Sequence, residues 1–263
     1  KGTAPLTKKK KQDAKKVGIF QWEEVPPEKL CEIVREKWEN WGELGVDGPR
    51  KIIVFINTVD RAIRVYRKIK GANFCPHVFL AHSRFTKQDR YKVEENLHDY
   101  FGKHAKPDEA VLITTQVAEA GLNISAPLVI TELCPMDSLL QRAGRCQRFK
   151  NGERELHGVV FVVKPEGQDW YLPYIDSIRI QRKQKSKTVP IAEITRIVLE
   201  KQSDDRGAIF LGWEREKELI AWALDDAYKA FLSGSNRIPF ENVEGKILGE
   251  VFQSLGGGKN EGG

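Results

Sequence analysis

Three arginines stand within seven residues near the middle of the chain, in the segment QRAGRCQR at 141–148. They are Arg142, Arg145 and Arg148, and Gln141 precedes them. A guanidinium group is a planar, permanently charged fork that fits the oxygens of a phosphate. Because like charges are costly to gather at one helix end unless they meet anions, this arginine segment predicts a phosphate-binding site. The alternative is a cluster of surface salt bridges.

Two strand–turn–helix units surround the arginine segment. Apolar runs at 111–114 and 128–133 each end in a polar, glycine-containing turn that leads into a helical pattern. Further apolar runs lie at 52–56, 77–81 and 159–163. Apolar strands that alternate with helices predict a doubly wound, mainly parallel α/β sheet, because crossovers between parallel strands are right-handed. Ligands of such sheets bind at the carboxyl ends of the strands.

Polar residues follow the carboxyl ends of three of these strands. They are Asn57 and Thr58, Ser83 and Arg84, and Thr114 and Thr115. Because carboxyl ends of parallel strands share one edge, we expect these residues on one rim of the sheet. Their polar groups suit nucleic-acid phosphates, and such contacts carry little sequence information. The alternatives are helix capping by Asn57 and Thr58 and strand-end packing of Thr114 and Thr115.

The composition is that of a soluble globular protein. The 263 residues are 40% hydrophobic and 30% charged, and the net charge of +6 favours an anionic partner without proving one. The sequence contains no signal peptide and no apolar run of membrane-spanning length, so we expect no membrane partner. The four cysteines form no CxxC pair, which indicates reduced thiols and a cytoplasmic location. The start at Lys1 suggests a fragment of a longer protein.

Three regions are predicted along the chain. Residues 1–46 form a basic linker, as a disordered segment or a nucleic-acid arm, and an amphipathic helix that opens at Pro26-Pro27. Residues 47–165 form the sheet, in which Thr86 and Asp89 resemble a capping box at a helix start. Residues 166–263 form a mostly helical accessory region with a strand-like run at 207–213 and a disordered tail. The basic run at 179–187 has a loop-like setting, either facing nucleic acid or solvated.

Two short patterns look catalytic but lack the necessary context. His98-Asp99 lies on an amphipathic helix of a chain with only five histidines, whereas a two-metal centre needs several converging ligands. The tail at 256–260 vaguely resembles a P-loop but lacks the Ser or Thr that binds Mg²⁺. We therefore expect no metal site in this chain.

Residues 50–165 resemble the second motor lobe, a RecA-like domain, of superfamily 2 helicases. The resemblance rests on INT at 56–58, HSR at 82–84, TTQVAEAGLNI at 114–124 and QRAGRCQR at 141–148. The wording TQVAEAG, ITELCP…DSLLQRAGR and HSRFTKQDR is most similar to the CRISPR-associated helicase–nuclease of type I interference systems. The resemblance implies that ATP and Mg²⁺ lie between two lobes, with the P-loop and the metal ligands on a first lobe that this chain lacks.

The resemblance also implies roles for individual residues. Arg145 and Arg148 would reach the γ-phosphate as arginine fingers, Gln141 would lie near it, and Arg142 would pair with an acid of its own lobe. In the turn segment, 114–124, Glu119 and Gly121 would shape the backbone. Asn123 stands where many relatives carry an aspartate that binds the ATP ribose. The rim residues Asn57, Thr58, Ser83, Arg84, Thr114 and Thr115 would contact the tracking strand.

The expected function is that of the C-terminal half of an ATP-dependent single-stranded DNA translocase in CRISPR interference. The resemblance implies movement from 3′ to 5′, a direction that the residues alone do not give. The expected partners are single-stranded DNA, a first helicase lobe, an HD nuclease domain or subunit, and a CRISPR surveillance complex. The sequence has no GxxxxGK[ST] and no DExH-type box, so we expect this chain alone to be inactive. The alternatives are a lobe of another superfamily 2 RNA or DNA-repair helicase, and a non-catalytic docking module.

Overall fold

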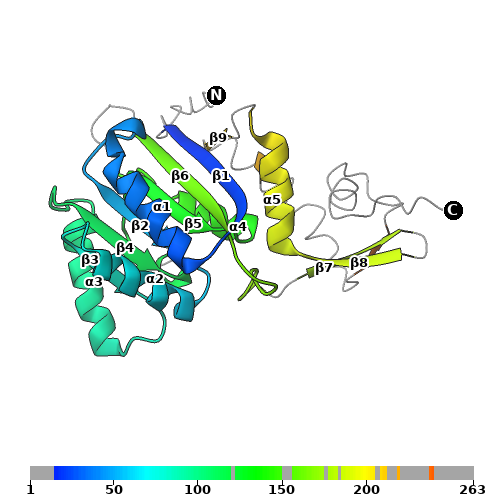
Figure 1. Ribbon diagram of the computed structural model, residues 1–263, viewed down its shortest axis with the longest axis horizontal. Coiled ribbons are helices and arrows are strands. Elements are labelled where there is room, and N and C mark those ends of the chain that lie inside the picture. The colour runs from blue at the N-terminus through cyan, green and yellow to red at the C-terminus, as the bar shows by residue number, and fades with distance from the viewer. Residues whose placement is uncertain are drawn as a thin grey trace, which may run out of the picture.

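A seven-stranded sheet with the order β3-β4-β2-β5-β6-β1-β9 forms the centre of the structure (Figure 1). This computed structural model describes residues 15–119, 122–149, 156–174, 177–182, 185–204, 208–211, 218–219 and 237–239. The strands of the sheet are β1 (Lys15–Val25), β2 (Lys51–Phe55), β3 (Val78–Ala81), β4 (Ala110–Thr114), β5 (Leu128–Glu132), β6 (His157–Pro165) and β9 (Ala208–Leu211). The helices are α1 (Pro27–Glu39), α2 (Val59–Ala72), α3 (Lys87–Phe101), α4 (Met136–Ala143) and α5 (Ile191–Gln202), with short 3-10 turns η1 (Trp41–Glu43) and η2 (Gln116–Ala118).

The predicted parallel sheet is confirmed. Strands β2 to β6 coincide with the five predicted runs, and each neighbouring pair among them is parallel. Every residue of β2, β4 and β5 is buried, as expected for strands that are covered on both faces. This arrangement brings the ends of β2, β3, β4 and β5 together at one edge.

Helices cover both faces of the sheet, which makes the fold doubly wound. Helices α1 and α2 pack on one face, where Leu30 and Val65 meet the side chains of Ile52, Val54 and Ile113. Helices α3, α4 and α5 contribute to the core on the other face, with side chains from β2, β4, β5 and β6. The amphipathic helix predicted after Pro26-Pro27 is confirmed as α1, whose apolar side chains at 30, 33, 34 and 38 are buried. Trp41, which was expected to continue the same face, lies in η1 and is only partly buried.

Strand β1 was not predicted. Residues 15–25 pair in parallel with β6 and antiparallel with β9, which lies inside the strand-like run predicted at 207–213. The sequence KKVGIFQWEEV carries charged residues at both ends, and the register shifts between Gln21 and Glu24, so it lacks a clean strand period. The boundary drawn at residue 47 stays a prediction, but the sheet includes residues that precede it.

A helix start at Thr86 is confirmed. The Thr86 Oγ1 accepts a hydrogen bond of 3.2 Å from the main-chain N–H of Asp89, and the same hydroxyl donates to the Asp89 carboxylate at 2.7 Å. The reciprocal pair holds the first turn of α3. This turn directly follows Ser83 and Arg84, so the capping bonds help to fix the position of the rim loop after β3.

Beyond residue 166 the described chain contains more strand than expected. Strands β7 (Ser177–Arg182), β8 (Lys185–Pro190) and β10 (Arg237–Pro239) form a separate sheet of three strands, order β10-β7-β8. The loop-like setting predicted for 179–187 is wrong, because the run lies on the paired strands β7 and β8. Alternation of Ile178 and Ile180 with Ser177, Arg179 and Gln181 is the strand period that the charge run concealed. Beyond residue 211, the region predicted to be mostly helical lies outside the described residues, except for 218–219 and 237–239.

Two other expectations concern membranes and metals. Among the described residues, no helix is long and apolar enough to cross a bilayer. The same part of the chain contains no group of three or more His, Cys, Asp or Glu side chains arranged to hold a metal ion. Residues 1–14 of the basic linker predicted at the start of the chain lie outside the described residues, as does the tail from Gly256, whereas Lys15 and Lys16 of the same basic segment begin β1.

Candidate functional site

Arg142 lies at the centre of the rim and is completely buried. Its Nε donates to the Glu119 carboxylate at 2.7 Å, and its Nη1 donates to the Asn57 Oδ1 at 3.1 Å and the Thr131 Oγ1 at 2.9 Å. Its Nη2 donates to the Tyr174 hydroxyl at 2.7 Å. A buried charge is stable only when it is paired and its hydrogen bonds are satisfied. The prediction that Arg142 pairs with an acid of its own lobe is confirmed.

Asn57 joins the end of β2 to this network. Its side chain is 2% exposed, and its Nδ2 donates to the carbonyl oxygen of Leu133 at 2.8 Å. Its main-chain N–H donates to the Glu132 carboxylate at 2.7 Å. The side-chain bonds therefore run to β5 and to Arg142 rather than to α2. Thr58 occupies the N-cap of α2 without a side-chain capping bond, so the capping alternative is not what the structure shows.

Thr114 and Thr115, at the end of β4, are also buried. The Thr114 Oγ1 donates to the carbonyl oxygen of Ala81 at 3.0 Å, and the main-chain N–H of Thr115 donates to the same oxygen at 3.3 Å. These bonds join β4 to the end of β3. The structure thus gives Thr114 the strand-end packing that was the alternative to a phosphate contact.

Ser83 and Arg84 are exposed in the loop after β3. The Arg84 Nη1 lies 2.6 Å from the Asp60 carboxylate, and both side chains are more than 60% exposed. An exposed ion pair of this kind contributes little to stability. Arg84 can therefore exchange its partner for an incoming phosphate at small cost.

Arg145 is buried behind the turn segment. Its two terminal nitrogens donate to the main-chain oxygens of Glu119 and Leu122. Its Nε has no hydrogen-bond partner within the described part of the chain. Burial, with a smaller contribution from nearby Arg148, lowers the pKa of the Arg145 guanidinium. In this conformation Arg145 joins Glu119 to Leu122, and residues 120 and 121, which include Gly121, lie outside the described residues.

Arg148 and Asn123 lie together on the surface. The Arg148 Nε donates to the Asn123 Oδ1 at 3.1 Å, and its main-chain N–H donates to the Ser125 hydroxyl at 2.9 Å. Both side chains are exposed, as is Gln141 on α4. The turn segment and the arginine segment therefore meet at the residues that were predicted to face the nucleotide.

Tyr174 and Gln116 are part of the site and were missed in the sequence. The Tyr174 hydroxyl donates to the Glu119 carboxylate at 3.3 Å and accepts from Arg142. The Gln116 Nε2 donates to the carbonyl oxygen of Asn57 at 2.9 Å. Tyr174 follows β6 in an irregular segment, so no periodicity could have indicated it. Gln116 stands inside TTQVAEAGLNI, which was the available signal for it.

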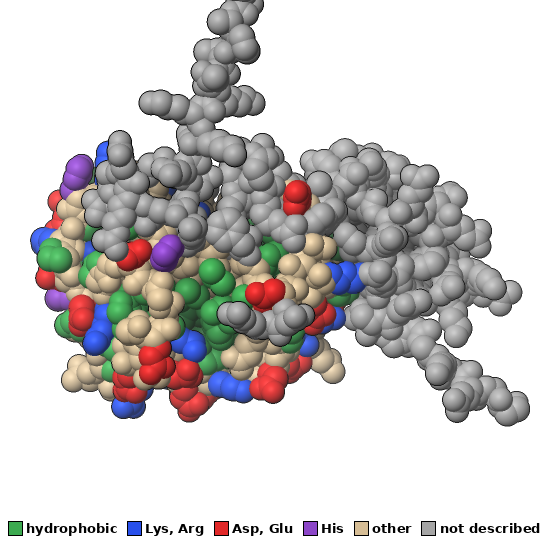
Figure 2. Space-filling view, turned by 90° about the horizontal axis from the view of Figure 1, so that it is seen from above, with side chains coloured by type: hydrophobic (Ala, Val, Ile, Leu, Met, Phe, Trp, Pro, Cys, Tyr) green, Lys and Arg blue, Asp and Glu red, His purple; other side chains and the backbone are tan. Residues whose placement is uncertain are grey.

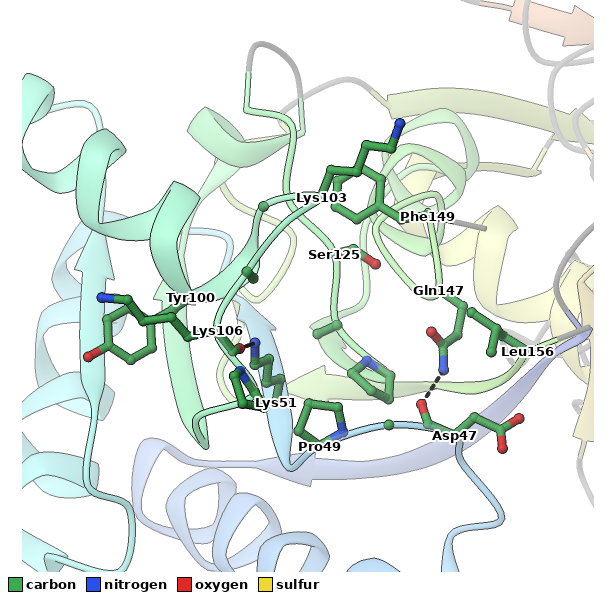
Figure 3. Close-up of a pocket in the computed structure, with 16 residues that line it drawn as sticks. Asp47, Pro49, Lys51, Tyr100, Lys103, Lys106, Ser125, Gln147, Phe149 and Leu156 are labelled. Carbon is green, nitrogen blue, oxygen red and sulfur yellow. Dashed lines mark hydrogen bonds between the residues drawn. The ribbon is translucent and has the colours of Figure 1, made fainter. Parts of the chain in front are cut away.

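A cavity of about 490 Å³ opens at the opposite, amino-terminal edge of the sheet (Figure 3). Its walls include Lys51, Tyr100, Ser125 and Gln147. The Lys51 ammonium donates to the carbonyl oxygen of Lys106, and burial lowers the pKa of Lys51. The main-chain N–H of Arg148 donates to the hydroxyl of Ser125, which lines the cavity, so the cavity adjoins the Asn123–Arg148 pair.

Comparison with known proteins agrees with these motifs. Residues 49–151 match the family described as CRISPR-associated nuclease/helicase Cas3, C-terminal. The chain is 33% identical over 150 residues to the CRISPR-associated nuclease/helicase Cas3 of Streptococcus thermophilus, covering 57% of this chain and 15% of that protein. It is 32% identical over 125 residues to the CRISPR-associated endonuclease/helicase Cas3 of Escherichia coli (strain K12), covering 46% of this chain and 14% of that protein. It therefore spans only a small part of these relatives.

Solved structures show the same fold. The crystal structure of T. fusca Cas3-ADP is similar over 93% of this chain and 27% of that one, with a TM-score of 0.60 and 21% identity. A structure described as a CRISPR RNA-guided surveillance complex, pre-nicking, is similar over 92% of this chain and 28% of that one, with a TM-score of 0.57 and 21% identity.

Proposed function

We propose that this chain, which carries a Cas3-like C-terminal helicase lobe, supplies the second half of an ATP-dependent single-stranded DNA translocase in CRISPR interference. The observation that carries the proposal is the exposed Arg148–Asn123 pair, in which the ends of the two helicase motifs are joined by a 3.1 Å hydrogen bond. Similarity to the structure of a CRISPR RNA-guided surveillance complex also supports a role of this chain in CRISPR interference.

The nucleotide side centres on Arg148. Phosphoryl transfer is catalysed mainly by positioning and by neutralising charge, and an exposed guanidinium beside an amide suits a triphosphate with its ribose. The hydrogen-bonding groups of Arg148 and Asn123 fit ATP. Among the described residues, no group of three or more acidic, His or Cys side chains could hold Mg²⁺. We propose that the first lobe binds this ion. When ATP and Mg²⁺ are bound, they supply the transferable phosphoryl group and its counter-charge.

We assign Arg145 a second position in the same cycle. In the present conformation it is bonded to main-chain oxygens of the turn segment, and its buried Nε lacks a partner. An unsatisfied buried N–H costs roughly 1–3 kcal/mol, which lowers the cost of leaving this position for a phosphate. Arg148 would therefore meet the nucleotide first, and Arg145 would follow as the turn moves.

The nucleic-acid side uses the exposed part of the rim. The exposed Ser83 and Arg84, together with the half-buried Thr58, would contact the backbone of the DNA strand. The buried Asn57, Thr114 and Thr115 would position that surface rather than touch DNA with their side chains. Figure 2 shows acidic and basic side chains mixed over the described part of one face of the molecule.

Arg84→Ala should weaken binding of single-stranded DNA by about two- to fivefold and reduce the dependence on salt by about one counterion, because one phosphate contact is lost. Fluorescence anisotropy at several salt concentrations measures both. Arg35→Ala on α1 is the matched control, because Arg35 is also an exposed arginine in an ion pair. Equal losses of DNA affinity in Arg84→Ala and Arg35→Ala would show that Arg84 does not contact the DNA.

The 263-residue chain alone should bind single-stranded DNA weakly and should not hydrolyse ATP, because the P-loop is absent from its sequence. A coupled-enzyme assay with saturating DNA, repeated with a first helicase lobe added, tests the proposal. Turnover by the chain alone would contradict it. Replacing DNA by RNA in the reconstituted assay distinguishes the alternative RNA helicase.

A further inference from the structure

The segment 166–174 forms a strap that leaves the end of β6 and reaches the site (Figure 1). Hydrogen bonds from the N–H of Leu172 to the Asp169 oxygen and from the N–H of Tyr174 to the Tyr171 oxygen fold it into turns. Trp170 and Tyr174 are partly buried against the core that α4 and α5 help to form. The strap is therefore packed in place, and its last described side chain is Tyr174.

The Tyr174 hydroxyl lies between one basic partner, Arg142 of the arginine segment, and one acidic partner, Glu119 of the turn segment. It accepts from the Arg142 Nη2 at 2.7 Å and donates to the Glu119 carboxylate at 3.3 Å, while Arg142 itself donates to the same carboxylate oxygen. The three groups close a ring of hydrogen bonds. Burial raises the pKa of the Tyr174 phenol to about 12, so the hydroxyl keeps its proton and can donate at neutral pH.

The same hydroxyl lies close to both functional sides of the lobe. On the nucleic-acid side, the Gln116 Nε2 lies 3.5 Å from it and also donates to the carbonyl oxygen of Asn57 at the rim. On the nucleotide side, the main chain of Glu119 accepts a hydrogen bond from Arg145. A shift of the rim can therefore change the position of Arg145 through the Tyr174 hydroxyl and the Glu119 carboxylate.

We propose that Tyr174 is a positioning residue that couples the nucleic-acid rim to the nucleotide-facing arginines, so that the strap transmits DNA binding to ATP hydrolysis. The inference rests on the proposed function and adds to it a residue outside the matched range 49–151. A tyrosine suits this task because its ring fixes the position by packing while its hydroxyl both donates and accepts.

The test is Tyr174→Phe in the whole helicase that contains this lobe, because this change keeps the ring and removes only the hydroxyl. The ratio of DNA-stimulated to unstimulated kcat should fall about tenfold, the factor expected when one hydrogen bond to a charged group is lost. A loss of folded protein would reduce both rates by the same factor and leave the ratio unchanged. Tyr171→Phe, in the same strap, is the matched control and should leave the ratio within about twofold.

Gln116→Leu combined with Tyr174→Phe tests the route. If the coupling passes from Gln116 through Tyr174, adding the second substitution to the first should lower the ratio of DNA-stimulated to unstimulated kcat by less than about a further twofold. Losses that multiply would overturn the route. In the 263-residue chain, the Nε–H NMR signal of Arg142 should move in Tyr174→Phe and stay in Tyr171→Phe, and an unmoved signal in both would overturn the contact.

Arg148→Ala separates failure of this inference from failure of the proposed function. If Arg148→Ala abolishes hydrolysis while Tyr174→Phe leaves the ratio within about twofold, the coupling is wrong and the motor function stands. If Arg148→Ala leaves hydrolysis unchanged, the motor function is wrong, and the coupling falls with it.

Discussion

Arg148→Ala should reduce DNA-stimulated ATP hydrolysis of the complete motor by about 10³-fold or more, the effect of removing an arginine finger in phosphoryl-transfer enzymes. Arg148 is exposed and its Nε donates a hydrogen bond to Asn123, so we expect it to meet a nucleotide carried by another lobe. Steady-state hydrolysis at saturating ATP and DNA measures the loss. Because charge develops in the transition state, kcat should fall more than the affinity for ATP.

Arg148→Lys and Arg90→Ala are the controls for this prediction. Lysine keeps the charge but not the bidentate fork, so it should recover only part of the rate. Arg90 is an exposed arginine on α3, paired with Glu94, and its loss should leave hydrolysis unchanged. Thermal unfolding of the Arg148→Ala chain should match that of the original chain, because the side chain is exposed. A decrease in hydrolysis of less than threefold would favour the non-catalytic docking module.

The central sheet could be predicted because its strands are short, apolar and separated by helices. Residues of β2, β4 and β5 are buried throughout, so their sequences show continuous apolar runs. Strand β1 lacks such a run, since it pairs near the edge of the sheet with β9 and carries charges at both ends. The basic run on β7 and β8 was predicted to be a loop for a related reason, because its many charged residues concealed the alternation that is typical of a strand.

The site was predictable in its residue types and less so in their roles. The sequences of the turn segment 114–124 and the arginine segment 141–148 predict that Arg142, Arg145 and Arg148 belong to one site, but spacing alone cannot tell which guanidinium is buried. That depends on acceptors from distant elements, such as Glu119 and Tyr174 for Arg142. Only Arg148 reaches the surface. Tyr174 could not be foreseen, because its position comes from the path of the chain after β6.

Arg142→Ala should destabilise the 263-residue chain by about 3–5 kcal/mol, the cost of removing one partner from a buried ion pair. The change leaves the Glu119 carboxylate, 9% exposed, without its cation. It also removes the donor to Asn57 and Thr131 and leaves space beside the Phe55 ring. Urea unfolding followed by circular dichroism measures the loss, and Arg148→Ala in the same assay should change stability by less than about 0.5 kcal/mol.

A double replacement separates the lost hydrogen bonds of Arg142 from lost charge pairing and packing. Arg142→Met with Glu119→Gln removes both charges and keeps most of the volume, so it should be more stable than Arg142→Ala by at least 1 kcal/mol. If both variants unfold at the same urea concentration, the hydrogen bonds that Arg142 donates to Asn57, Thr131 and Tyr174, which are lost in both, hold the site. If Arg142→Ala costs less than about 1 kcal/mol, the network is not a structural requirement, and a buried arginine kept at that position would have to serve the nucleotide directly.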